Sequence, residues 1–279
     1  MPVRIVTDSA ADLPPNDVEQ LGVAVVPLSI RFGDKEYTDG VDLSVEEFYA
    51  KLASTDALPE TSAPAPGAFD SAFRRQAEAG ADAVVCINLS SGLSATIQAA
   101  QSAAAGLAGE LDVRVVDSRS ITSGLGTHVR LAAAAAGDGA SADEVVALVE
   151  NLVPRTHVFG ALDTLENLKK GGRIGGARAM LGSLLSIKPL LDISSGEVEE
   201  AGKARTRRKA LEWLRDRIFE QSDIEHLTIA HGLAPDLDAM LDLLAPRYSR
   251  DQISITTIGA TIGTHGGPRV MGATWVDPA

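Results

Sequence analysis

Residues that can hold an anion gather at 90–96 (SSGLSAT), between an apolar run and an alanine-rich pattern. The run at 83–87 (AVVCI) predicts a buried strand, and residues 97–107 predict a helix. Backbone N–H groups at a helix start have no partner within the helix, so they and neighbouring hydroxyls can bind an anion. Serine and threonine also favour helix starts where no ligand is bound. Taken alone, residues 90–96 therefore favour a capped helix over a binding site.

Two further strands are expected to end in the same kind of residues. Apolar runs at 3–6 and 113–116 are followed by 7–10 (TDSA) and 117–120 (DSRS). Alternating strands and helices predict a parallel sheet with helices on both faces, so that the three strand ends meet at one edge. Ligands of open α/β sheets bind at this edge. The aspartates there are candidates for acid–base chemistry, but we favour capping of the next turn as their role.

The remaining elements must hold these groups in place. Several prolines predict an extended, hydroxyl-bearing loop at 60–63 (ETSA). Glycine and aspartate predict a hairpin turn at 32–37, and Ser44 with Glu47 predicts a capping box. Further strands are expected at 23–30, 158–162, 190–193, 226–231, 253–258 and 270–276. Helices are expected at 12–20, 69–79, 124–136, 142–152, 164–170 and 235–244, and another should run from the basic cluster at 203–209 to about residue 219. Residues 181–189 lead into one of these strands, and 263–268 (GTHGGP) indicate a loop.

Composition limits the classes of function. The formal net charge of −13 argues against general affinity for nucleic acid or anionic membranes. Cys86 is the single cysteine, so an intramolecular disulfide is excluded. Its position in an apolar run indicates a buried thiol. The chain opens into a strand without a signal-peptide pattern, and no apolar run is long enough to span a bilayer. We therefore expect a cytoplasmic protein.

Several chemistries lack their sequence signatures. Neither a phosphate-binding P-loop motif nor G-x-G-x-x-G after a strand is present, and G-x-S-x-G is missing too. The five histidines lie far apart without cysteine partners, so neither a metal site nor a cofactor is expected. What remains is a set of hydroxyls, His265 in a predicted loop, and a basic cluster at 203–209. Such groups are suited to holding a carboxylate or a phosphate.

Seven blocks of the chain resemble, in order and spacing, those of the DegV family. They are 7–14 (TDSAADLP), 60–64 (ETSAP), 90–96 (SSGLSAT), 116–118 (VDS), 168–174 (LKKGGRI), 187–189 (IKP) and 202–205 (GKAR). The resemblance covers essentially the whole chain. It implies two α/β domains with the ligand between them: residues 1–154 as a three-layer α/β/α domain with a mainly parallel sheet, and residues 155–279 as a two-layer domain with a mixed sheet.

The resemblance also implies a function. Members bind a long-chain fatty acid and present its carboxylate to a separate fatty acid kinase, so this chain would be a carrier and not itself an enzyme. The carboxylate would be bound by Thr61, Ser62, Ser94, Ala95 and His265. His265 could also bind it in the protonated, imidazolium form. Partner or phosphate contacts would come from Arg173, Lys203 and Arg205. The acyl tail would dominate affinity, because each buried CH₂ contributes about 0.8 kcal/mol.

The chain departs from the family at three positions. Ala65 stands where many members have serine, and Ala95 where glycine is usual. Members more often show Gly-Pro-Gly after the histidine, whereas Arg269 replaces the second glycine here.

Other readings of these residues stay open. Ser94 or Ser91 with His265 would suit a hydrolase or acyltransferase, and a short, polar cavity would suit a regulator that binds another small carboxylate. Thr61 and Ser62 could merely satisfy backbone groups in the proline-rich loop, and His265 could be a solvated loop residue. Without the family, Arg173 and the basic cluster would more often be a solvated helix end than a docking surface.

Overall fold

A four-stranded parallel sheet organises the N-terminal half of the chain in the computed structural model, which describes residues 2–55, 57–182 and 187–279. Its strand order is β2-β1-β6-β7. The central strand β6 is buried along its whole length, which explains why it reads as a continuous apolar run. The strands are β1 (Val3–Asp8), β2 (Ala24–Val26), β6 (Ala83–Asn88) and β7 (Asp112–Asp117).

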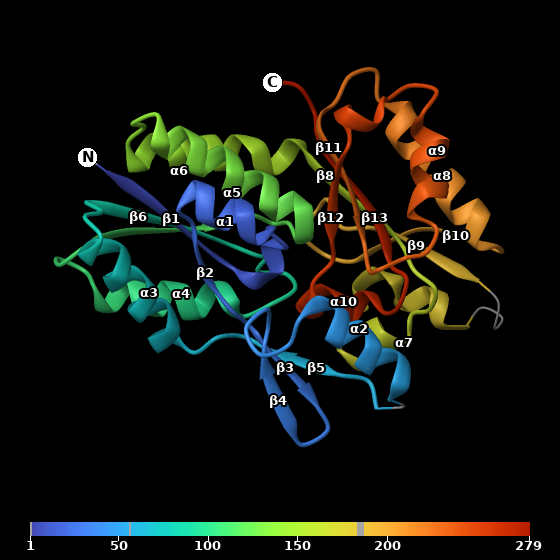
Figure 1. The fold of residues 1–279 in the computed structure, drawn as a ribbon, viewed down its shortest axis with the longest axis horizontal. Helices are drawn as coiled ribbons and strands as arrows, with labels where there is room; N and C mark the ends of the chain where they lie inside the picture. The colour runs from blue at the N-terminus through green and yellow to red at the C-terminus, as the bar shows by residue number, and fades with distance from the viewer. Residues whose placement is uncertain (1, 56, 183–186) are drawn as a thin grey trace.

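Helices cover both faces of this sheet, as predicted (Figure 1). On one face α3 (Pro66–Glu78) and α4 (Thr96–Gly106) pack against a core that includes Cys86. On the other face α5 (Thr122–Gly137) and α6 (Ala142–Leu152) build a second core. The small helix α1 (Pro15–Leu21) lies beside α5.

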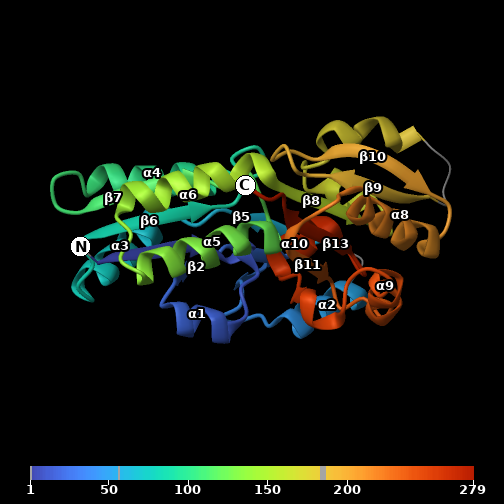
Figure 2. The ribbon, with the colours of Figure 1, turned by 90° about the horizontal axis from the view of Figure 1, so that it is seen from above.

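The C-terminal half is built on a six-stranded mixed sheet, order β10-β9-β8-β13-β11-β12, in which only β11 and β12 pair in parallel. One face is covered by α8 (Arg207–Glu220) and α9 (Leu237–Leu244) around the buried Trp275. The two halves lie side by side in both views (Figures 1 and 2). The strands are β8 (Thr156–Ala161), β9 (Lys188–Asp192), β10 (Glu199–Ala204), β11 (Glu225–His231), β12 (Ser254–Thr257) and β13 (Met271–Val276).

A small three-stranded antiparallel sheet was not predicted from the sequence as a unit. It has the order β4-β3-β5, with β3 (Ser29–Phe32), β4 (Lys35–Thr38) and β5 (Glu60–Ser62). The predicted hairpin is present as β3 and β4, and helix α2 (Val45–Ser54) starts with the predicted capping box. The proline-rich segment is extended as expected. It is nevertheless a strand rather than a loop, because it pairs with β3.

One further prediction is wrong. Residues 263–268 were expected to form a loop, but most of them belong to α10 (Ala260–Gly266). The short helix α7 (Glu166–Lys170) packs beside it, and the 3-10 segment η3 (Gly175–Gly182) follows α7 along the chain. Of the run at 181–189, residues 183–186 lie outside the described part of the chain. The domain boundary near Pro154 stays a prediction. Among the described residues, none of the helices has the length and apolar character needed to cross a membrane.

Candidate functional site

A cavity lies between the six-stranded sheet and the strand ends of the four-stranded sheet. Its lining residues surround about 820 Å³ of empty space, part of which is open to solvent. The centres of water molecules could occupy only about 100 Å³ of it, so the space is narrow. Leu89 and Leu93 line it from the loop after β6, Val158 and Leu191 line it from the six-stranded sheet, and Val270 lines it from the residue before β13. A narrow, mostly aliphatic space suits an extended apolar chain.

Two glycines make room in the floor of this cavity. Gly160 of β8 and Gly272 of β13 are register partners in neighbouring strands, and both line the space. At these two positions the cavity is lined by backbone atoms of the sheet and not by side chains. An occupant can therefore lie close against the sheet.

Polar side chains also belong to the lining. Thr61, on β5, places its Oγ1 2.9 Å from Nε2 of His265, on α10. Ser94 precedes α4, where its Oγ accepts a hydrogen bond from the N–H of Thr96 at 3.2 Å and lies 2.9 Å from the Thr96 hydroxyl. Thr61, Ser94 and His265 all line the cavity. Three segments distant in sequence thus supply neutral hydrogen-bonding groups to one cavity.

The imidazole of His265 is held in its neutral form. Burial lowers its pKa from 6.5 to about 4, and the positive charge of Arg173 adds to the effect. The imidazolium considered from the sequence is therefore disfavoured at neutral pH. Nδ1 is buried and has no hydrogen-bond partner in the described part of the chain. It faces Gly171, where a Cβ atom would overlap the ring.

Arg173 connects the basic turn after α7 with the loop before α4. Its Nε donates to the carbonyl of Leu93 at 3.1 Å, and its Nη1 donates to the carbonyl of Gly171 at 2.6 Å. Its side chain lines the cavity and is half-buried. A positive charge thus stands in the lining, close enough to His265 to act on its pKa.

The other predicted site residues lie outside this lining. Ser62 and Ala95 are exposed, and neither lines the cavity. Lys203 and Arg205 are exposed near the end of β10. Their predicted roles stay predictions.

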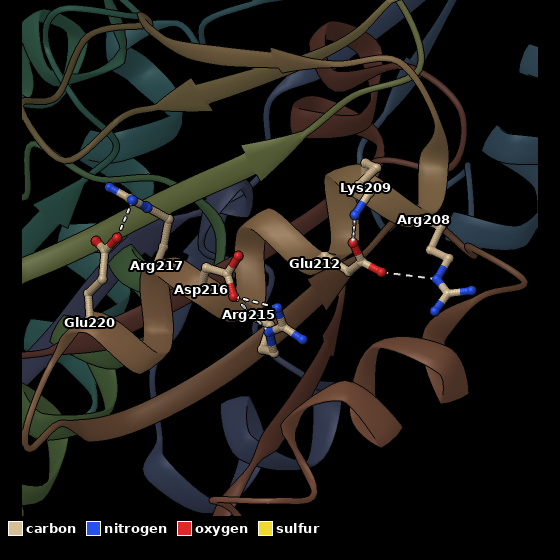
Figure 3. A network of polar contacts seen from close by, with 7 residues as sticks. All are labelled: Arg208, Lys209, Glu212, Arg215, Asp216, Arg217 and Glu220. Carbon is tan, nitrogen blue, oxygen red and sulfur yellow. Dashed lines mark hydrogen bonds and ion pairs between the residues drawn. The ribbon is translucent and has the colours of Figure 1, made fainter.

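The basic cluster at 203–209 is partly neutralised by its own surroundings. Arg207 makes a bidentate contact with Asp236, at 2.7 and 3.1 Å. Arg208 and Lys209 both pair with Glu212 on α8, as Figure 3 shows. Exposed pairs of this kind contribute little to stability. Lys203 and Arg205 have no ion-pair partner among the described residues.

Arg269, just before β13, adopts a backbone conformation that glycine favours. Its φ is +58°. Its guanidinium lies 3.6 Å from Asp163 and 3.7 Å from Asp236. These two carboxylates are the ion-pair partners of Arg269 in the described part of the chain.

Three carboxylates near the cavity were not singled out from the sequence as a group: Asp8 and Asp39, which are buried, and Asp12, which is half-buried. Burial raises the pKa of Asp8 to about 6 and that of Asp12 to about 8, and it raises the pKa of Asp39 as well. Asp8 accepts from the N–H of Ala10 at 3.0 Å, which confirms its predicted capping role. Asp117 likewise accepts from the N–H of Arg119 at 2.9 Å. Nothing in the sequence pattern marks Asp12 or Asp39 as buried.

Two cavity-lining threonines were also missed. Thr122 begins α5 with a φ of +46°, and its buried hydroxyl has no hydrogen-bond partner of good geometry among the described residues. Thr261 lies on α10, four residues before His265. Only the helical spacing of Thr261 and His265 could have indicated a shared face, and the segment was not recognised as a helix.

Comparisons with known proteins agree with this architecture. The model of the DegV family, described as uncharacterised proteins, matches residues 2–277. The DegV domain-containing protein SCO2569 of Streptomyces coelicolor is 37% identical over 274 residues, which are 97% of this chain and 96% of that protein. The DegV domain-containing protein lmo2514 of Listeria monocytogenes is 35% identical, with 98% of each chain covered.

Two solved structures are similar over their full length. A DegV family protein from Thermus thermophilus, described by the words "fatty acid binding", is 34% identical with a TM-score of 0.90, and 100% of each chain is covered. DegV from Bacillus subtilis, described as a fatty acid binding protein, is 27% identical with a TM-score of 0.89 and the same coverage. Both halves of the fold, and the cleft between them, are thus shared with known structures.

Proposed function

Because the chain belongs to the DegV family, we propose that it binds one long-chain fatty acid in the cavity and presents the carboxylate to a fatty acid kinase. One observation carries the binding proposal: the cavity is narrow and mostly aliphatic, with Thr61, Ser94 and His265 in its lining. An amphipathic chain with a single polar end matches that distribution. The similar proteins from Thermus thermophilus and Bacillus subtilis are described as binding fatty acids.

The polar groups are suited to a carboxylate. Its oxygens only accept hydrogen bonds, and hydroxyls and an imidazole N–H can donate them. Thr61 and His265 already lie 2.9 Å apart, so one carboxylate oxygen can be shared between them after a small adjustment. Arg173 supplies the nearby positive charge, since His265 is neutral. The tail supplies most of the affinity, at about 0.8 kcal/mol per buried CH₂.

A serine hydrolase is less well supported by the same geometry. A nucleophilic serine needs a base within hydrogen-bond reach, and the base needs an orienting partner. The Ser94 hydroxyl is hydrogen-bonded to the Thr96 hydroxyl, whereas Nε2 of His265 is hydrogen-bonded to Thr61 and not to Ser94. Nδ1 of His265 has no partner among the described residues. Labelling of Ser94 by a fluorophosphonate would support the hydrolase function instead.

A regulator of a small polar carboxylate is also less well supported. Such a ligand would favour a short and polar cavity, whereas leucine, isoleucine and valine side chains dominate this lining. Burying a small polar molecule among them would leave its polar groups without partners.

Native mass spectrometry of protein purified from cells tests the binding proposal. We expect the chain with one additional mass of a long-chain fatty acid, and the same acid in an organic extract. A mass equal to the bare chain, together with an extract free of lipid, would contradict the proposal.

Presentation to a kinase needs a separate test. Thr61→Ala and Ser94→Ala should lower acyl phosphate formation by a fatty acid kinase more than they lower retention of the acid, because the tail supplies most of the affinity. Equal turnover in wild type and both variants would rule out the head-group assignment.

We assign Lys203 and Arg205 to the kinase-facing surface, since they are exposed and have no ion-pair partner in the described chain.

A further inference from the structure

The helix that carries His265 lacks a cap of its own. Its N-cap position is Gly259, which has no side chain to accept from the first N–H groups. A Cβ atom at Gly259 would lie 2.7 Å from Oδ1 of Asp12, which accepts from the Gly259 N–H at 3.0 Å. An ordinary capping residue such as serine therefore does not fit there.

A carboxylate far away in sequence takes the place of that cap. Oδ2 of Asp39 accepts from the hydroxyl of Thr261 at 2.5 Å, across 222 residues of chain. The backbone N–H groups of Ala260 and Thr261 also interact with this carboxylate. Asp39 is only 6% exposed, and Ser9 donates its hydroxyl to the same oxygen at 2.8 Å.

Asp39 and Thr61 reach α10 from the same small sheet. Asp39 directly follows β4, and its N–H donates to the carbonyl of Leu28, the residue before β3. Thr61 lies on β5, opposite Ile30 of β3. The three-stranded sheet therefore contacts α10 at Thr261 through Asp39 and one turn later at His265 through Thr61. Residues four apart lie on one face of a helix, so both contacts act on the cavity-facing side.

The far end of α10 is fixed separately. The amide of Asn167, on α7, donates to the carbonyl of Thr264 at 2.9 Å. With its C-terminal end held there, loss of Asp39 would free mainly the first turn of the helix. His265 lies one turn further along the same seven-residue helix, so a tilt of the first turn about the held end changes the angle at which its ring meets Thr61.

We propose that Asp39 is a positioning residue of the head-group site: by capping α10 from the three-stranded sheet, it holds His265 against Thr61 before any ligand binds. The consequence for the fatty acid rests on the proposed function. The consequence for the His265 ring does not, because it concerns the free protein.

Two measurements on Asp39→Ala test the proposal. The first is the ¹⁵N NMR spectrum of the His265 imidazole in lipid-free protein, with the signal assigned by its loss in His265→Gln. The second is the affinity for oleate. We expect the imidazole signals to move and the affinity to fall by about tenfold, as for loss of a buried charge-assisted hydrogen bond. Asp39→Asn retains one acceptor oxygen and should recover part of both effects.

Asp34→Ala is the matched control. Asp34 is an exposed aspartate in the turn between β3 and β4 of the same small sheet, and it should leave both readouts as in wild type. If Asp39→Ala does not fold, the His265 spectrum and the oleate affinity are measured on Thr261→Val instead. This variant removes only the hydroxyl from which Asp39 accepts a hydrogen bond, so the same changes are expected.

The outcomes separate the two proposals. A native His265 spectrum in folded Asp39→Ala would overturn the positioning role, whatever the protein binds. Failure of wild type to bind oleate would remove the proposed function, and the His265 spectrum would still decide the role of Asp39.

Discussion

At the scale of single residues, the lining of the cavity combines neutral hydrogen-bonding groups with one cation. The pKa of His265 lies near 4, so the ring stays neutral over the physiological range. Its Nε2 meets the Thr61 hydroxyl, and Arg173 carries the charge. A neutral ring can donate one N–H to a carboxylate without the cost of burying a second cation.

Asp12 gives a pH-dependent prediction. Burial raises its pKa from 3.8 to about 8 in the folded chain, and its buried Oδ2 lacks a hydrogen bond of good geometry within the described residues. A carboxyl with a raised pKa stabilises the fold fully below its unfolded pKa, and this contribution is lost as the pH rises through the folded pKa. Asp12→Asn cannot ionise and keeps an acceptor for the Gly259 N–H.

The melting temperature of Asp12→Asn relative to wild type should therefore rise between about pH 5 and about pH 8. Thermal unfolding followed by circular dichroism at several pH values measures this difference. A difference that stays constant, or that falls over this interval, would contradict the assigned burial of the carboxyl.

Some of these residue roles could be predicted from the sequence and others could not. The hydroxyls at strand ends are visible because parallel strands end at a common edge, and the block at 90–96 that contains Ser94 follows such an end. The burial of Asp12 and Asp39 is not visible, because it depends on residues 259–261 more than 200 positions later. Local pattern carries no information about such partners.

At the scale of elements, α10 is the clearest case in which tertiary contacts override local preference. Its segment contains three glycines at 259, 263 and 266, which favour a loop. Gly263 lies where a Cβ would approach the ring of Phe48 to 2.7 Å, so α2 packs directly on its backbone. The cap from Asp39 then replaces the local signal that is missing.

The end of α7 also shapes the site and gives a second prediction. Gly171 has a φ of −69°, which alanine adopts readily, but a Cβ there would overlap the His265 ring. Gly171→Ala should displace the ring and weaken oleate binding by about tenfold, since overpacking costs on the order of 1–3 kcal/mol. Titration with a fluorescent fatty acid measures the change.

Gly106→Ala is its control. Gly106 ends α4, and nothing lies within 4 Å of a Cβ placed there. It should bind oleate as wild type does. Equal affinity of Gly171→Ala and Gly106→Ala would show that the ring is free to move aside.

At the scale of the whole molecule, the cavity exists only because the two halves are held together. The Ser90 hydroxyl donates to the carbonyl of Gly196 at 2.5 Å, and Arg119 donates to the carbonyl of Ser195. Both carbonyls belong to the turn between β9 and β10. The loops after β6 and β7 thus bind the six-stranded sheet directly.

Adjacent serines allow this contact to be tested. Ser90→Ala leaves a buried carbonyl unpaired and should destabilise the protein by about 2 kcal/mol. Ser91→Ala should change stability by less than about 0.5 kcal/mol, because Ser91 is exposed. Urea unfolding of both variants provides the comparison. Equal stabilities would mean that the Ser90–Gly196 contact does not hold the halves together.

The overall architecture was largely predictable, for a physical reason. Strands buried on both faces read as apolar runs, and the helices between them have crossover lengths, so the parallel sheet follows from the sequence. The three-stranded sheet was missed because β5 has only three residues and no alternating pattern. Its core is completed by Ala260, at the start of α10. A sheet that shares its core with the other end of the chain leaves little local signal.

The proposed fatty acid lies in the cavity with its carboxylate at Thr61, Ser94 and His265. The most direct test is ¹³C NMR of oleate labelled at its carboxyl carbon, bound to lipid-free protein. We expect a bound carboxyl signal that is distinct from that of oleate in vesicles and that shifts in Thr61→Ala. A carboxyl signal at the vesicle position, or a bound signal unchanged in Thr61→Ala, would contradict it.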